Sequence, residues 1–179
     1  MTQRTETPSP SAWATRAGYT ACLAPLIGFV PLHMLWALGT PLWAYGEQFD
    51  DWYADGGGPY LLLLCALALL GSVLAVALVR PCGHFFPRWV PRLAGRPVPR
   101  KLVLWPAFAG SVLLTVYSLW GTPLALYFMF ADRDDLVFNA WAGVGTMVVI
   151  LAWVAGLVSA TWSYHVRTSP KRRVVPPAA

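Results

Sequence analysis

Residues 102–130 read LVLWPAFAGSVLLTVYSLWGTPLALYFMF, and this stretch contains no Asp, Glu, Lys or Arg. It exceeds the roughly 20 residues that an α-helix needs to cross a hydrocarbon core of about 30 Å. Three further stretches reach the same minimum and are equally free of charge, residues 17–45, 59–79 and 136–164. The sequence therefore predicts an all-α fold, a bundle of four transmembrane helices.

The composition also indicates a membrane protein. Of the 179 residues, 57% are hydrophobic and 12% are charged, against about 25% charged residues in ordinary soluble domains. We expect one membrane domain over residues 17–165, because a soluble domain of this size has no core that could bury four such stretches. A mobile tail of residues 1–16 precedes it, a basic loop of residues 80–101 joins its halves, and a basic tail of residues 166–179 follows it.

The charged residues are sorted by sign between the two sides of the predicted membrane. The loop 80–101 and the tail 166–179 contain Lys and Arg but no acid, whereas all acids but one lie in the two remaining loops. Short cytoplasmic loops accumulate Lys and Arg. We therefore expect a multi-pass protein of the cell membrane with both termini in the cytoplasm and both acidic loops outside.

Several function classes receive no support. The net charge of +5 does not indicate a nucleic-acid partner, because the basic residues lie near helix ends, where anionic lipid head groups can pair with them. Membrane lipids are the expected partners. Cys22, Cys65 and Cys82 are far apart and form no CxxC pair. We therefore predict neither a metal site nor a cofactor.

The chain contains an internal repeat, since GTPLWAY at 39–45 matches GTPLALY at 121–127. The first and third stretches run in the same direction, so this repeat predicts two parallel helical hairpins related by an axis along the membrane normal. Both stretches also contain prolines, which bend a helix and free backbone carbonyls. We therefore expect residues 17–45 and 102–130 to line any central site.

Three acids are candidate catalytic residues. Asp50 and Asp132 are equivalent in the repeat, and Glu47 precedes Asp50 by about one helical turn. Such carboxylates at the outer mouth could bind a cation, or their mutual repulsion could keep one carboxyl neutral as a general acid. Alternatively, they are ordinary acids of solvated outer loops. The sequence leaves both interpretations open.

Within the apolar stretches, one titratable side chain and a set of aromatic residues are candidates for chemistry. His33 lies near the middle of residues 17–45. A polar group at that depth is either functional or hydrogen-bonded to a neighbouring helix. The aromatic residues form either a membrane-interface belt or a pocket that stabilises a carbocation by cation–π attraction. They are Trp36, Trp43, Tyr45, Tyr117, Trp120 and Tyr127.

Residues 86–110 read FPRWVPRLAGRPVPRKLVLWPAFAG, and with the apolar helices on either side they resemble small four-helix integral membrane proteins of high-GC actinobacteria. The resemblance covers about residues 17–165. In size and aromatic content the chain is also similar to small membrane-bound terpene cyclases of these bacteria. No catalytic motif of that group matches residue by residue, so the resemblance assigns no site.

The leading functional hypothesis is a membrane enzyme that cyclises a lipid-soluble isoprenoid by acid initiation. Glu47, Asp50 or Asp132 would supply the proton, the six aromatic residues would line the cation path, and His33 would be a deeper base or polar anchor. The alternative is a non-enzymatic protein: a transport subunit, an immunity factor or a membrane scaffold. The lack of charge within the apolar stretches argues against an ion-coupled pump.

Overall fold

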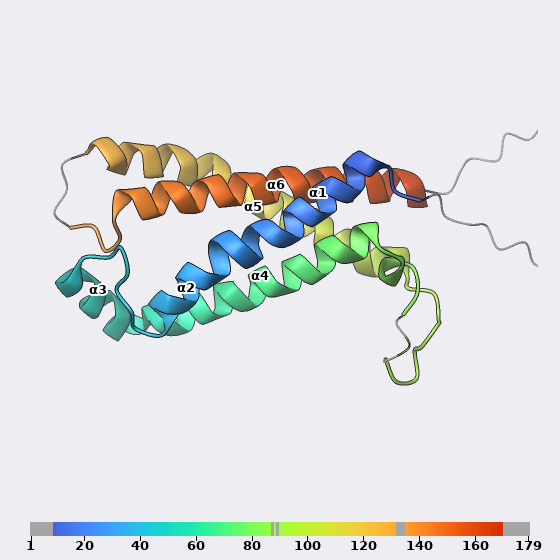
Figure 1. Ribbon diagram of the computed structural model, residues 1–179, viewed down its shortest axis with the longest axis horizontal. Helices are drawn as coiled ribbons and strands as arrows, with labels where there is room; N and C mark the ends of the chain where they lie inside the picture. The colour runs from blue at the N-terminus through green and yellow to red at the C-terminus, as the bar shows by residue number, and fades with distance from the viewer. Residues whose placement is uncertain (1–8, 87, 89, 132–134, 170–179) are drawn as a thin grey trace, which may run out of the picture.

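The computed structural model describes residues 9–86, 88, 90–131 and 135–169. They form an all-helical fold, with no β-strand in these ranges, and the long helices run side by side (Figure 1). Within the described residues, four helical segments are long and apolar enough to cross a membrane, which confirms the predicted four-helix membrane bundle. The elements are α1 (Ala12–Leu23), η1 (Ala24–Phe29), α2 (Val30–Ala37), α3 (Gly46–Trp52), η2 (Tyr53–Gly57), α4 (Gly58–Val79), η3 (Pro81–Gly83), α5 (Arg100–Phe130) and α6 (Ala140–Thr168).

The first and last transmembrane segments have other ends than the sequence predicted. The first covers Ala12–Ala37 and stops well before residue 45. Gly39 adopts a φ of 81°, a left-handed conformation that commonly ends helices and that glycine adopts without steric cost. Helix α6 begins at Ala140 rather than at residue 136, because the Asn139 side chain caps it by accepting a 2.9 Å hydrogen bond from the backbone N–H of Trp141.

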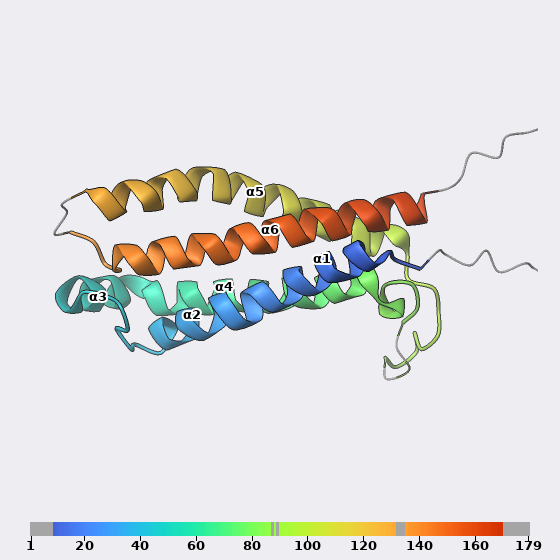
Figure 2. The same cartoon turned by 45° about the horizontal axis from the view of Figure 1, so that its top comes forward.

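The prolines of the two proline-containing segments have different effects. Next to Pro25 the first segment widens into the π-helical turn η1, whereas Pro106 and Pro123 lie inside the continuous helix α5, which follows a curved path (Figure 2). Wider turns and curvature accommodate the carbonyls that proline leaves without a donor. Residues 39–45 thus lie in a connection and residues 121–127 inside α5, so the matching stretches have different conformations.

Helix α6 occupies the middle of the bundle. It packs against α5 on one side and against α1 and η1 on the other, while α4 packs against α1 and α2. Figure 2 shows most of α5 on the opposite side of α6 from α1, and α5 also contacts α4. The expectation that the two proline-containing segments line a common centre was therefore wrong, because α6 lies between them.

The contact between α1 and α6 depends on small residues. Gly156 of α6 is buried against the backbone of α1, where a Cβ atom would lie 2.7 Å from the carbonyl oxygen of Ala17 and 2.8 Å from the backbone nitrogen of Ala21. Ala160 follows one turn later and is fully buried. This Gly-xxx-Ala spacing allows two membrane helices to approach closely and to gain dispersion energy.

One end of the bundle contains the start of α1, the connection 80–99 and the end of α6 (Figure 1); we call it the basic end. Its arginines also stabilise helix termini. Arg167 donates a 2.8 Å hydrogen bond to the carbonyl of Leu78 in the last turn of α4. Arg100 donates to the carbonyl of His165 in the last turn of α6 at 3.2 Å. Cations at these positions satisfy free carbonyls and interact favourably with the helix dipole.

The opposite end contains the connection 38–45, α3 and residues 135–139 (Figure 1); we call it the acidic end. Its two extended segments pair, because the Tyr45 N–H donates to the Val137 carbonyl at 2.9 Å and the Asn139 N–H donates to the Trp43 carbonyl at 2.8 Å. Phe49 of α3, only 1% exposed, packs beneath this pair. These contacts make a structured cap at the acidic end.

Candidate functional site

The predicted acids lie on the surface of the cap at the acidic end. Glu47 and Asp50 are exposed on α3, whose buried side is formed by Phe49. Their carboxylates therefore face away from the bundle. Asp132, their proposed partner in the repeat, lies outside the described residues.

His33 and Trp36 come together in the bundle. The ring of His33 is 6% exposed, stacks on Phe29 with centroids 3.6 Å apart, and meets Trp36 edge-on at 5.0 Å. Its Nδ1 donates a 2.8 Å hydrogen bond to the Phe29 carbonyl one turn earlier, so this ring nitrogen has its partner within the same segment. Because that segment ends at Ala37, His33 lies near its end at the acidic end of the bundle rather than at its middle.

The indole of Trp36 belongs to the cap. Its Nε1–H donates a 2.6 Å hydrogen bond to the Leu42 carbonyl, and its ring packs on Phe138 with centroids 4.2 Å apart. Trp36 is therefore a core residue that joins α2 to the paired segments of the acidic end.

The other five predicted aromatic residues do not converge with Trp36. Trp43 and Tyr45 are exposed in the connection 38–45, and the remaining three are exposed along α5, on the other side of α6. Their exposure places them toward lipid or the membrane interface, where amphipathic rings are common. The three α5 residues are Tyr117, Trp120 and Tyr127.

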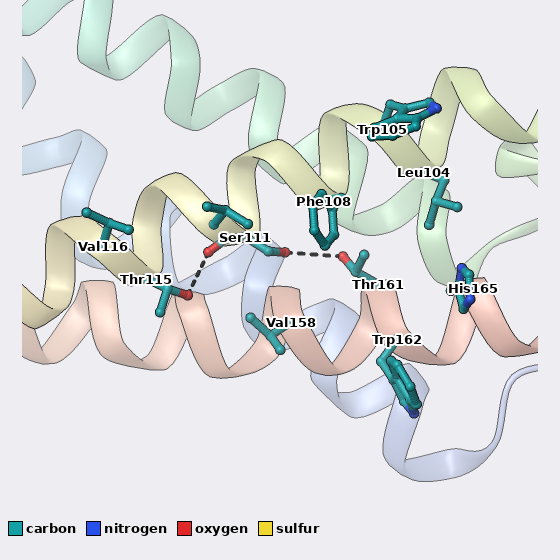
Figure 3. Close-up of a pocket in the computed structure, with 11 residues that line it drawn as sticks. Leu104, Trp105, Phe108, Ser111, Thr115, Val116, Val158, Thr161, Trp162 and His165 are labelled. Carbon is teal, nitrogen blue, oxygen red and sulfur yellow. Dashed lines mark hydrogen bonds between the residues drawn. The ribbon is translucent and has the colours of Figure 1, made fainter.

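A different site lies between α5 and α6, in the half of the bundle next to the basic end (Figure 3). It is an open groove of about 620 Å³, within the range of roughly 300–1,000 Å³ that is usual for small-molecule pockets. Its walls are mostly apolar and aromatic. The lining residues are Leu104, Trp105, Phe108, Ser111, Val112, Thr115, Val116, Val158, Thr161, Trp162 and His165.

The floor of this groove carries the polar groups. Ser111 and Thr161 are buried, and their hydroxyl oxygens lie 3.5 Å apart across the two helices. The Ser111 hydroxyl donates to the Ala107 carbonyl at 2.7 Å, and Thr115 donates to the Ser111 carbonyl at 2.6 Å. Figure 3 shows the Ser111–Thr161 and Thr115–Ser111 contacts between the two helices. Hydroxyls that bond to their own helix offer little polarity to a ligand, so the groove favours apolar molecules.

At the basic end, His165 lines the groove and Arg100 is hydrogen-bonded to it. The Arg100 Nη2 lies 3.0 Å from Nδ1 of His165 and 3.1 Å from Oγ of Ser169, and Nε donates to the Thr168 hydroxyl at 2.8 Å. Guanidinium groups only donate hydrogen bonds, so Nδ1 of His165 is the acceptor. In the neutral imidazole the remaining proton is then on Nε2, which provides a donor at the end of the groove.

Sequence reasoning did not identify the groove. Trp105, Phe108 and Trp162 carry no motif, and Ser111 and Thr161 are ordinary interhelical residues in a membrane protein. The groove exists because α5 packs chiefly on α6, and the order of packing is a tertiary property. The one sequence signal for the groove was a tryptophan close to a basic residue at two helix ends, Trp105 after Lys101 and Trp162 before Arg167.

Among the described residues, no three His, Cys, Asp or Glu side chains lie together in a way that could hold a metal ion. Cys65 is buried and Cys82 is exposed, and both are free thiols. No protein family, curated protein or solved structure matches this chain. The groove is therefore interpreted from its own geometry and chemistry.

Proposed function

We propose that this integral membrane protein binds the hydrocarbon chain of a lipid-soluble molecule, acyl or isoprenoid, in the groove between α5 and α6. The observation that carries the proposal is an open, mostly apolar groove on two membrane-spanning helices, with aromatic walls and its few hydroxyls engaged at the floor. Such a groove faces lipid directly, so a ligand can enter from the bilayer. Dispersion contacts, rather than the hydrophobic effect, favour association there.

The proposed orientation places the basic end in the cytoplasm, with both termini on that side. It is supported by the charge distribution, since Lys and Arg are retained on the cytoplasmic side of a membrane. Cys82 provides a natural probe because it is exposed at the basic end, whereas Cys65 is buried. A membrane-impermeant maleimide should label Cys82 in inverted vesicles but not in intact cells; the reverse pattern would invert the topology.

Cyclisation of an isoprenoid stays a hypothesis beside this binding function, as does the similarity to membrane-bound terpene cyclases. The aromatic walls of the groove favour it, because Trp105, Phe108 and Trp162 could stabilise a carbocation. It also requires a carboxylic acid close by, and Glu47 and Asp50 lie at the opposite end of the bundle (Figure 1). Incubation of membranes with an epoxidised polyene, followed by a search for isomeric products, tests it.

Photo-crosslinking in nanodiscs tests the binding function. We would use a zwitterionic phospholipid with a diazirine on one acyl chain, and an isoprenoid alcohol with the same group. Crosslinks should concentrate in residues 104–116 and 158–165, which contain the groove. Val158→Trp fills the groove and should remove most of them, whereas Val148→Trp changes an exposed valine of α6 outside the groove and should not. Uniform crosslinking along all four helices would refute the function.

A further inference from the structure

We propose that the ligand of the groove is a membrane lipid with an anionic phosphate head group, recognised at the basic end by Arg100, His165 and Lys101. This inference rests on the proposed chain-binding function and names the chemistry of its polar part. Three features of the described residues carry it: the depth at which the groove ends, the charge at that end, and the hydrogen bonds that fix Arg100.

The groove ends at head-group depth. Two tryptophans line its walls at the basic end, Trp105 near the start of α5 and Trp162 near the end of α6. They are 62% and 65% exposed, respectively. Tryptophan is enriched where the hydrocarbon core meets the head groups. A chain that occupies the groove therefore has its polar group beside Arg100, Lys101 and His165, rather than deep in the membrane.

The charge at this end complements a phosphate. Among the described residues, all acids lie at the acidic end of the bundle, in α3, η2 and residue 135, on the far side of the membrane from the groove mouth. The basic end carries only cations in the same ranges. A basic residue near the membrane surface attracts an anionic lipid by about 1 kcal/mol. The cations are Arg16, Arg80, Arg88, Arg92, Arg96, Arg100, Lys101 and Arg167.

Arg100 is held in position for this role. Its Nε and Nη2 bond to Thr168, His165 and Ser169 of the α6 terminus, while its Nη1 has no hydrogen-bond partner among the described residues. The same contact leaves the Nε2 donor of His165 at the end of the groove. A fixed guanidinium with free donors suits a phosphate, because planar N–H groups match its oxygens. Lys101, exposed on the next residue, adds a mobile cation.

A second copy of this chain fits the groove less well. Two copies side by side in one membrane have the same orientation, so their basic ends would meet and repel each other. An anionic lipid neutralises that charge and also supplies the hydrocarbon chain. The groove and the basic end together therefore favour a lipid.

The test compares photo-crosslinking by two phospholipids with identical diazirine chains, one with a phosphatidylglycerol and one with a phosphatidylcholine head group. We expect crosslinks to residues 104–116 and 158–165 to be about 25-fold stronger with phosphatidylglycerol, since Arg100 and Lys101 contribute about fivefold each. Lys101→Gln should reduce this preference about fivefold. Arg100→Gln should reduce it at least as much. Arg92→Gln should retain it, because Arg92 is an exposed cation of the connection 80–99, outside the two helices that form the groove.

The outcomes separate the two proposals. Equal groove crosslinking by both lipids would overturn phosphate recognition and leave chain binding intact, whereas the absence of groove crosslinks with either lipid would overturn chain binding. Arg100→Gln also removes contacts to α6 and could prevent folding. In that case the result for Lys101→Gln decides between the outcomes. Sodium phosphate should suppress the preference more than sodium chloride of equal ionic strength. Equal suppression by both salts would indicate nonspecific attraction and overturn the site.

Discussion

The close contact between α1 and α6 leads to a prediction for Gly156. In Gly156→Ala, the new Cβ would lie 2.7 Å from the Ala17 carbonyl oxygen and 2.8 Å from the Ala21 backbone nitrogen. Both neighbours are backbone atoms, so no rotamer change can relieve the overlap. The helices must separate by about 0.7 Å to bring the first distance to 3.4 Å, where ordinary contacts begin.

The expected energy follows from two opposing effects. Overpacking of a close contact costs about 1–3 kcal/mol, and the higher helix propensity of alanine returns up to about 1 kcal/mol. We therefore expect Gly156→Ala to lower the free energy of unfolding by about 1 kcal/mol. Gly156→Val adds a branched side chain at the same place and should lower it by about 3 kcal/mol.

Gly143→Ala is the matched control, because a Cβ at Gly143 of the same helix would meet no atom within 4 Å. It should leave stability unchanged or raise it by up to about 1 kcal/mol. The measurement is unfolding by sodium dodecyl sulfate in mixed micelles, followed by circular dichroism. If Gly156→Ala and Gly143→Ala unfold at the same detergent fraction, the close packing of α6 on α1 is refuted.

Three further predictions concern the two ends of the bundle. Trp36→Phe removes the donor to the Leu42 carbonyl; we expect a loss of about 1–2 kcal/mol and faster proteolysis of the connection 38–45, and unchanged proteolysis would contradict the cap. At the basic end, burial first and a nearby arginine second lower the pKa of His84 below its ordinary 6.5. Folding then favours the neutral ring, so the contribution of His84 to stability should be complete above about pH 6.5 and decrease as the pH falls below that value. Unfolding curves of His84→Gln measured over the same pH range should lack this decrease. Glu47→Gln and Asp50→Asn change exposed side chains and should alter the free energy of unfolding by less than about 0.5 kcal/mol. Loss of the cyclised product in a polyene assay would therefore support the cyclisation hypothesis. Full product formation by both variants would exclude these two acids as the proton source.

The sequence did not predict which side chains of the membrane helices face a site and which are buried in the core. His33 and Trp36 were predicted as functional residues and do lie together, but they contact each other within the packed core between α2 and the cap. Tyr117 and Trp120 were predicted to belong either to an interface belt or to a pocket, and both are exposed on α5. A membrane helix is apolar on all sides, so its sequence carries little of the polarity pattern that marks the packed face of a soluble helix.

The sequence by itself determined the four membrane-spanning segments and the separation of acids from bases, because the length of an apolar stretch and the position of a charge are properties of the chain alone. Only the tertiary structure decided that α6 lies between α1 and α5, that the first segment ends at Ala37, and that a groove opens between α5 and α6. These features depend on which helices approach closely. That choice is made by the fit of small residues such as Gly156 against a particular neighbour, and hydrophobicity does not encode it.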